Sequence, residues 1–257
     1  MSPEETNSQA TTPLNGIIVK IKGLSKEFNG NKVLDNISLD VNRGENIVVL
    51  GKSGSGKSTL IKCLIGLIPP DAGEIIILGK NLLQLDYDEL NDLRLKMGFL
   101  FQGAALYDSM TVKENLNFPL SHHHKELSKT ELDKLTMEAL GQVGLQEAAG
   151  KMPSELSGGM TKRIGLARTL ILQPEIMLYD EPTTGLDTAT AKEISQLILE
   201  LQKKNNISSI IITHDMNCAR MTADKIVILR EGSIVAEGTY ETLSNSTDEW
   251  IRSFFTK

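Results

Sequence analysis

The sequence predicts an α/β fold built on a mostly parallel sheet, with an antiparallel β subdomain near the N-terminus and an inserted helical subdomain. The central strand candidates are continuous apolar runs without alternation, which is typical of strands that helices cover on both faces. One of these runs is followed directly by a glycine-rich loop and then by a helical pattern. A helix-rich block separates two groups of strands, which indicates the insertion.

The strands are expected in short apolar runs that turn residues separate. The runs lie at 17–21, 47–50, 74–78, 97–101, 176–181, 209–213, 225–229 and 233–236. Residues 25–40 are expected to form a separate hairpin, because Asn29-Gly30-Asn31 is a turn signal ahead of an alternating segment. The run Pro-Pro-Asp-Ala-Gly at 69–73 should break the chain before the next strand.

Helices are expected where apolar residues recur every three or four positions. These patterns lie at 59–67, 86–96 and 160–171, and in a stretch that Asp187 should cap. Within the predicted helical subdomain, at about 103–160, Ser128 and Glu131 form a capping box that opens a helix, and Gly144 ends it. His122, His123 and His124 also lie in this block. Consecutive histidines point in different directions on a helix, so we interpret them as a solvated loop rather than a shared metal site.

Composition excludes several classes of protein. The chain has 257 residues, of which 40% are hydrophobic, enough for a substantial core, and its net charge of −6 gives no sign of a nucleic-acid binder. No apolar run approaches the roughly 18–20 residues of a membrane span. Cys63 and Cys218 match no metal-ligand spacing and are expected to be reduced and packed. Residues 1–15 indicate a disordered tail, and 16–257 a single domain.

The glycine-rich loop has the pattern of a phosphate-binding loop. Its residues, with the helical residue that follows, are Gly51, Lys52, Ser53, Gly54, Ser55, Gly56, Lys57, Ser58 and Thr59. Glycines let successive backbone N–H groups turn toward a phosphate, and the N-terminus of the following helix adds a partial positive charge. Lys57 can reach the outer phosphates, and the Ser58 hydroxyl is placed to ligate Mg²⁺.

Polar residues follow other strands at the same predicted edge of the sheet. Gln102, Asp180, Glu181 and His214 each come at or just past the end of an apolar run, where ligands bind in parallel sheets. We expect Asp180 to hold hydrated Mg²⁺, Glu181 to orient and polarise the attacking water, and His214 to contact the γ-phosphate or that water. Phe28 lies at the hairpin turn, where an aromatic ring either stacks on a nucleotide base or closes the turn.

Together these residues resemble the ABC ATPases, the nucleotide-binding domains of ABC transporters, from about Ile17 onward. The matching motifs are Phe28 (A-loop), 51–58 (Walker A), Gln102 (Q-loop), Leu156-Ser157-Gly158-Gly159-Met160 (signature), 176–181 (Walker B), 185–187 (D-loop) and His214 (switch histidine). The resemblance implies a RecA-like P-loop NTPase fold, with ATP and Mg²⁺ as cofactors. It implies that ATP is contacted by Phe28, Gly51 to Thr59, Gln102, Ser157, Gly158, Gly159 and Asp180, that Mg²⁺ is held by Ser58, Gln102 and Asp180, and that the catalytic residues are Glu181, His214 and Lys57.

The same resemblance implies partners. Two copies of the chain should sandwich two ATP molecules, with Ser157, Gly158 and Gly159 binding the γ-phosphate of the opposite copy. Separate integral membrane permease subunits should hold the ATPase at the cytoplasmic face of an inner membrane, with no nucleic acid involved. A cleft beside the Q-loop should receive a permease helix, and we expect Leu106, Tyr107 and Met110 to line it.

One departure from the family pattern narrows the resemblance. Where the family has Gln after the two signature glycines, this chain has Met160. Residues 160–168, and the segments 101–112 and 114–120, are similar to the ATPases of Mla/Mce-type lipid transporters. This implies phospholipid or another hydrophobic cargo, with an Mce-type lipid-binding protein reached through the permease. The alternatives are an iron–sulfur assembly ATPase, an ABC ATPase for a different cargo, and a nucleotide-binding module without catalysis. The last disagrees with the intact Lys57, Asp180, Glu181 and His214.

Overall fold

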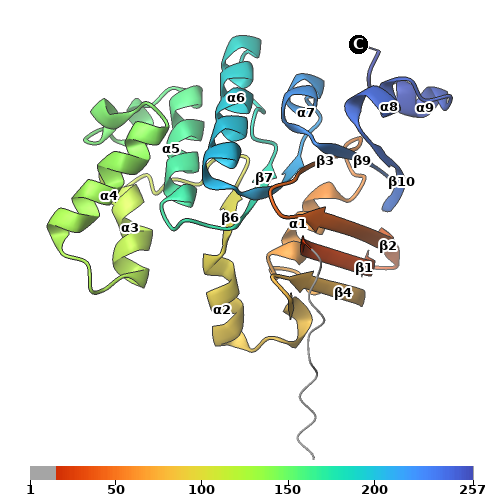
Figure 1. Cartoon of the computed structure of the whole chain (residues 1–257), viewed down its shortest axis with the longest axis horizontal. Helices are drawn as coiled ribbons and strands as arrows, with labels where there is room; N and C mark the ends of the chain where they lie inside the picture. Colours follow the sequence, from red (N-terminus) through yellow and green to blue (C-terminus); the bar gives the residue numbers. More distant parts are fainter. Residues whose placement is uncertain (1–15, 257) are drawn as a thin grey trace, which may run out of the picture.

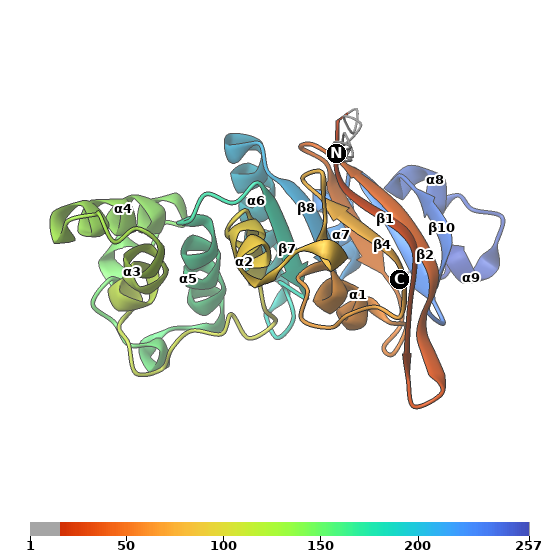
Figure 2. The same ribbon diagram turned by 90° about the horizontal axis from the view of Figure 1, so that it is seen from below.

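The structure is a computed structural model that describes residues 16–256. The tail expected at residues 1–15 lies outside the described residues. The described part forms a mixed α/β molecule, with an antiparallel sheet at one end and a group of helices at the other (Figures 1 and 2).

The larger sheet of the described residues has the strand order β10-β9-β3-β8-β7-β6. Its parallel strands are β3 (Asn46–Leu50), β6 (Met97–Leu100), β7 (Ile176–Asp180), β8 (Ser208–Ile212) and β9 (Lys225–Arg230), and β10 (Ser233–Gly238) pairs antiparallel with β9. Along β3 the side chains alternate between two cores: Ile47 and Val49 belong to one, Val48 and Leu50 to the other. The sheet is therefore covered on both faces, as the unbroken apolar runs predicted.

The smaller sheet has the order β2-β1-β4-β5. Its strands are β1 (Ile17–Phe28), β2 (Asn31–Asn42), β4 (Ala72–Ile77) and β5 (Lys80–Asn81), all paired antiparallel. The expected turn at Asn29-Gly30 is present, with φ angles of 51° and 81° that Asn and Gly tolerate. The prediction of a short first strand followed by a separate hairpin is wrong. The residues between them continue β1, because register shifts absorb the misfit with β2.

Along the chain, helices follow strands of both sheets. They are α1 (Lys57–Leu64), α2 (Tyr87–Leu95), α6 (Thr188–Asn205), α7 (Met216–Thr222), α8 (Tyr240–Ser244) and α9 (Glu249–Arg252), with short 3₁₀ turns η1 (Leu82–Gln84), η2 (Gln146–Ala148) and η3 (Pro153–Glu155). Asp187 caps α6 as expected, accepting hydrogen bonds from the backbone N–H groups of Ala189 and Thr190. The expected break at 69–73 is shorter than predicted, because β4 already begins at Ala72, which pairs with Ser25 of β1.

The helical end contains α3 (Val112–His123), α4 (Lys129–Gln142) and α5 (Gly158–Leu170). The capping box of Ser128 and Glu131 begins α4 as predicted. The loop predicted for His122 and His123 is wrong, because both lie in the last turn of α3, although their side chains are exposed. A second capping box, of Thr111 and Glu114, begins this helix.

The two cysteines are both free and fully buried, one in each core. Burial raises the pKa of the Cys63 thiol to about 11, and burial likewise raises the pKa of Cys218 to about 11. Among the described residues, no helix is both long and apolar enough to span a membrane.

Candidate nucleotide site

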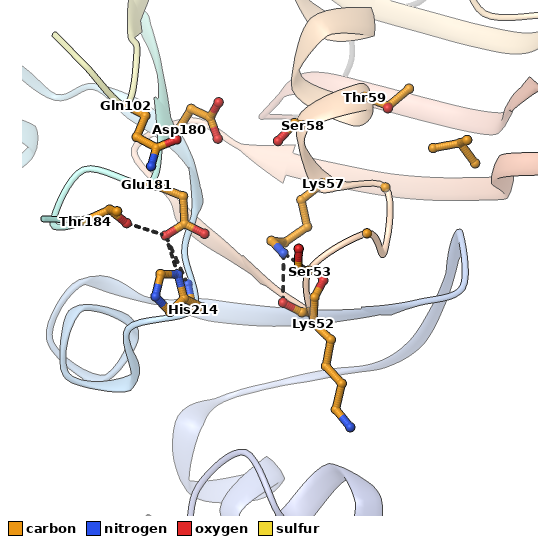
Figure 3. A pocket seen from close by; sticks show the side chains of 14 residues that line it. Lys52, Ser53, Lys57, Ser58, Thr59, Gln102, Asp180, Glu181, Thr184 and His214 are labelled. Carbon is orange, nitrogen blue, oxygen red and sulfur yellow. Dashed lines mark hydrogen bonds and ion pairs between the residues drawn. The ribbon is translucent and has the colours of Figure 1, made fainter. Parts of the chain in front are cut away.

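A cavity of about 560 Å³ lies at the carboxyl ends of the parallel strands (Figure 3). It is lined by Val33, Gly51, Lys52, Ser53, Gly54, Gly56, Lys57, Ser58, Thr59, Gln102, Asp180, Glu181, Thr184 and His214. The structure therefore brings together most of the residues that the sequence placed at this edge. Val33 and Thr184 are lining residues that the sequence reasoning missed.

The phosphate loop is held in place by close backbone contacts. A Cβ atom on Gly56 would lie 2.5 Å from the carbonyl oxygen of Val33, and φ there is 105°, so only glycine fits without strain. A Cβ atom on Gly51 would lie 2.6 Å from the carbonyl oxygen of Leu229. Gly56 also caps α1 without a side-chain hydrogen bond, which leaves the helix N-terminus free to bind an anion.

Lys57 reaches back across this loop. Its Nζ donates to the carbonyl oxygens of Gly51 at 2.8 Å and Lys52 at 3.1 Å, and the residue is only 9% exposed. Burial lowers the pKa of Lys57, while the nearby carboxylates of Glu181 and Asp180 act in the opposite direction. The ammonium group is thus fixed beside the loop, where a bound phosphate would supply a further negative partner.

The opposite side of the cavity contains a hydrogen-bonded group centred on Glu181. Its Oε2 lies 2.8 Å from Nδ1 of His214 and accepts hydrogen bonds from the His214 backbone N–H (3.3 Å) and the Thr184 hydroxyl (3.1 Å). Glu181 has a left-handed backbone, φ 52°, which turns the chain directly after β7. The Glu181 side chain is 15% exposed and that of His214 is 67% exposed, so the carboxylate is sheltered while the imidazole faces the solvent.

The expected metal ligands fit a hard divalent cation. Ser58, Gln102 and Asp180 come from α1, the end of β6 and the end of β7, and all three line the cavity. They offer hydroxyl, amide and carboxylate oxygens, the donors that Mg²⁺ prefers. Burial raises the pKa of Asp180, and the negative charge of Glu181 raises it further. A cation at this position would relieve that repulsion.

Five of the expected nucleotide contacts lie outside the lining of this cavity. Phe28 is 42% exposed at the end of β1, with Lys26 Nζ 5.2 Å from its ring centroid. The Ser55 side chain is buried, and its hydroxyl would lie 2.4 Å from a Cβ atom on Gly51. Ser157, Gly158 and Gly159 stand at the start of α5, where Ser157 caps the helix by accepting from the Met160 N–H. The signature residues therefore do not contribute to the cavity of their own chain.

A second cavity, of about 510 Å³, lies between β6 and α3. Tyr107 lines it, together with Phe101, Phe118 and Pro119. Leu106 and Met110, which were expected with Tyr107 in a cleft beside the Q-loop, are not part of this lining. Left-handed turns at Ala104 and Ala105 redirect the chain, so Leu106 packs against the core and Tyr107 faces outward, 45% exposed.

Comparison with known proteins gives consistent matches over the chain. A family model described as ABC transporter matches residues 34–184. The probable ribonucleotide transport ATP-binding protein mkl of Mycobacterium leprae is 40% identical over 239 residues, which cover 93% of this chain and 69% of that protein. The intermembrane phospholipid transport system ATP-binding protein MlaF of Haemophilus influenzae is 36% identical over 241 residues, covering 94% and 91%.

The fold is also similar to a solved structure. A dimeric, post-hydrolysis state of the ATP-binding cassette MJ0796, bound to ADP and Pi, aligns with a TM-score of 0.79 and 34% identity, over 86% of this chain and 98% of that one. The predicted α/β fold and the predicted family are confirmed. With a family model over more than half of the chain, relatives of similar sequence and a cassette of the same fold, the chain belongs to the ABC transporter family as an ATP-binding, ATP-hydrolysing cassette.

Proposed function

We propose that this cassette powers the movement of phospholipid, or of another hydrophobic substrate, through separate permease subunits. The observation that carries the cargo assignment is the similarity to MlaF, which spans nearly the full length of both chains. The Met160 signature supports the same assignment. The mkl relative is named for ribonucleotide transport, but this chain spans only 69% of its length.

The residues of the cavity have different roles in ATP hydrolysis. The phosphate loop N–H groups and Lys57 bind the phosphates, and Ser58, Gln102 and Asp180 hold Mg²⁺, which neutralises phosphate charge when bound. Glu181 accepts a proton from, and orients, the attacking water, because its carboxylate is the sheltered base of the cavity. His214 is hydrogen-bonded to Glu181 and exposed to the cavity, which suits it to contact the γ-phosphate.

A second copy of the chain completes each site. Ser157 and Gly158 are exposed and Gly159 is half-buried at the start of α5, outside their own cavity, so this helix N-terminus is available to a phosphate bound by another copy. The cassette MJ0796 forms a dimer in its solved structure, which supports this arrangement. Sedimentation of the Glu181→Gln protein with ATP tests it: a dimer is expected, and a species that stays monomeric even with the permease present contradicts it.

The second cavity is the proposed docking site of a cytoplasmic permease helix. Its apolar lining includes Tyr107 and Phe118, whose rings lie 5.1 Å apart, both about half exposed. Tyr107→Asp should keep ATP binding and lose permease-stimulated turnover. Leu106→Asp should instead destabilise the fold, because Leu106 packs against the core. Such docking would hold the cassette at the cytoplasmic face of an inner membrane.

The cargo is tested by purifying the tagged chain with its partners from detergent-solubilised membranes. We expect a lipid-type permease and an Mce-type lipid-binding protein in the complex, and transfer of labelled phospholipid between vesicles that depends on ATP. Recovery of a sugar or amino-acid permease would exclude the lipid cargo and leave the ATPase assignment intact. Recovery of soluble iron–sulfur assembly proteins would exclude transport.

A further inference from the structure

Helix α5, which begins at the signature, carries a buried cation outside the lining of the nucleotide cavity. Lys162 is 5% exposed and, with Lys57, is one of two lysines among the buried polar residues of the described chain. Long charged side chains on helices normally keep their head groups in water. Burial of this ammonium group therefore needs specific partners.

Its partners are two backbone carbonyl groups of the nucleotide site. Lys162 Nζ donates to the carbonyl oxygen of Gln102 and lies 3.4 Å from the carbonyl oxygen of Glu181, to which it also donates. Gln102 follows β6 and Glu181 follows β7, and both side chains line the cavity. One nitrogen atom thus connects the backbones of two residues that reach the site from different strands.

Two other residues of α5 contact the segment that directly follows Gln102. Arg168 donates to the carbonyl oxygens of Ala104 at 3.0 Å and Ala105 at 2.8 Å. A Cβ atom on Gly165 would lie 2.8 Å from Cβ of Ala104, so the helix and the segment are in direct contact. Lys162, Gly165 and Arg168 are three residues apart, which places them along one side of α5.

The electrostatic setting accounts for a charged group at this position. Two neutral carbonyls alone compensate a buried ammonium poorly. Glu181 and Asp180 lie close enough to favour the charged form, although burial acts against it and lowers the pKa of Lys162. The two carboxylates therefore add to the compensation that the carbonyl groups provide.

We propose that Lys162 is a positioning residue for hydrolysis, which fixes Gln102 and Glu181 relative to each other by holding both of their backbones. Because the same helix begins with Ser157, Lys162 also connects the cavity of its own chain with the surface offered to the second copy. The inference rests on the proposed function of Gln102 and Glu181.

Three variants of α5 test this role. Lys162→Met keeps the length and apolar stem but removes the donors, and Lys162→Gln keeps a neutral donor. The matched control is Arg163→Met, since Arg163 bonds the Val143 carbonyl and Glu193 instead of the nucleotide segments. We expect Lys162→Met to lower kcat by roughly 10- to 100-fold, as small misplacements of catalytic groups do. Its Kd for ATP should stay within about twofold of wild type, and Lys162→Gln should recover part of kcat.

Hydrogen exchange in the nucleotide-free protein provides a readout apart from activity. The backbone N–H groups of Ala104 and Thr184 bond to the carbonyls of Phe101 and Glu181, so both should exchange faster in Lys162→Met and at the wild-type rate in Arg163→Met. If Lys162→Met does not fold, Lys162→Gln carries the comparison through the same two measurements.

Three results would overturn the inference: a kcat for Lys162→Met within about twofold of wild type, an equal loss in Arg163→Met, or no gain from Gln over Met. If the proposed function itself were wrong, the experiments would give a different result. In that case Glu181→Gln would retain wild-type turnover, whatever Lys162 does.

Discussion

The two sides of the nucleotide cavity are held by different kinds of contact. The phosphate-loop side is fixed by backbones that approach closely at Gly51 and Gly56, and Lys57 is tied to two carbonyls of the loop itself. The opposite side is held by side-chain hydrogen bonds of Glu181, which is bonded to Thr184 in its own loop and to His214 in the segment after β8. The loop side is therefore fixed mainly by backbone approach, whereas the geometry of the side that carries the base depends on individual side-chain hydrogen bonds.

The largest effect is expected on the Glu181 side. Glu181→Gln keeps the size of the side chain and can still bond Thr184 and His214, but an amide is not an effective base. Turnover should fall by about 10²- to 10⁴-fold, while ATP binding stays near normal. Single-turnover kinetics with equilibrium ATP binding checks this, and turnover near wild type would show that Glu181 is not the base.

A smaller, different effect is expected on the loop side. Lys57→Ala removes a buried charge beside the phosphates, and charge-assisted hydrogen bonds contribute about 1.5–3 kcal/mol. ATP affinity should therefore weaken by roughly 10- to 100-fold. Titration with a fluorescent ATP analogue measures the change, with Lys203→Ala as the control, because Lys203 is an exposed lysine on α6 outside the lining of the cavity. Equal losses in the two variants would contradict the role of Lys57.

Thr184→Val tests whether the hydrogen bonds around Glu181 matter individually. Valine has the shape of threonine without the hydroxyl that donates to Glu181. A net hydrogen bond contributes about 0.5–1.5 kcal/mol, so we expect a roughly 2- to 12-fold lower kcat and an unchanged ATP affinity. Thr184→Ser should restore the rate. A Val variant as active as wild type would mean that His214 alone orients the carboxylate.

Asp180→Asn should raise the melting temperature of the nucleotide-free protein at neutral pH. The pKa of Asp180 is raised by burial and by Glu181, so the folded chain penalises the carboxylate. Such an acid contributes most stability below its unfolded pKa, and that contribution is lost as pH rises through its folded pKa. At neutral pH the Asn variant should melt higher, by about 2–4 °C for each kcal/mol relieved, and the gain should vanish near pH 4. A lower Tm at neutral pH would contradict this.

Local patterns were enough to predict most of the cavity lining, because its main segments each contain a short recognisable pattern. The loop at 51–58 has the pattern of a phosphate-binding loop, and the two acids come at the end of an apolar strand, so both can be recognised in the sequence. Thr184 was missed because its contact with Glu181 depends on the left-handed turn at Glu181. Lys162 was missed for a related reason: a lysine next to an arginine suggests a solvated helix face, and only the packing of α5 shows that it is buried.

The helical end was predicted less well, since tertiary contacts override local signals there. Pro119 and the histidines disfavour a helix, yet α3 forms through them. Its start is fixed by buried Asn115, whose side chain accepts from the Tyr107 N–H and donates to the carbonyls of Tyr107, Met110 and Thr111. No periodic pattern encodes such a network, and the direction of Leu106 depends on the turn that precedes it.

The burial of both native thiols has a practical consequence for measuring motion. With pKa values near 11 and no exposed surface, Cys63 and Cys218 hold almost no reactive thiolate at neutral pH. A maleimide dye should therefore leave the native protein unlabelled and modify only a cysteine introduced at an exposed position, such as Ser154 beside the signature. Fluorescence energy transfer between two copies labelled in this way would follow their approach during each catalytic cycle, without removing either native cysteine.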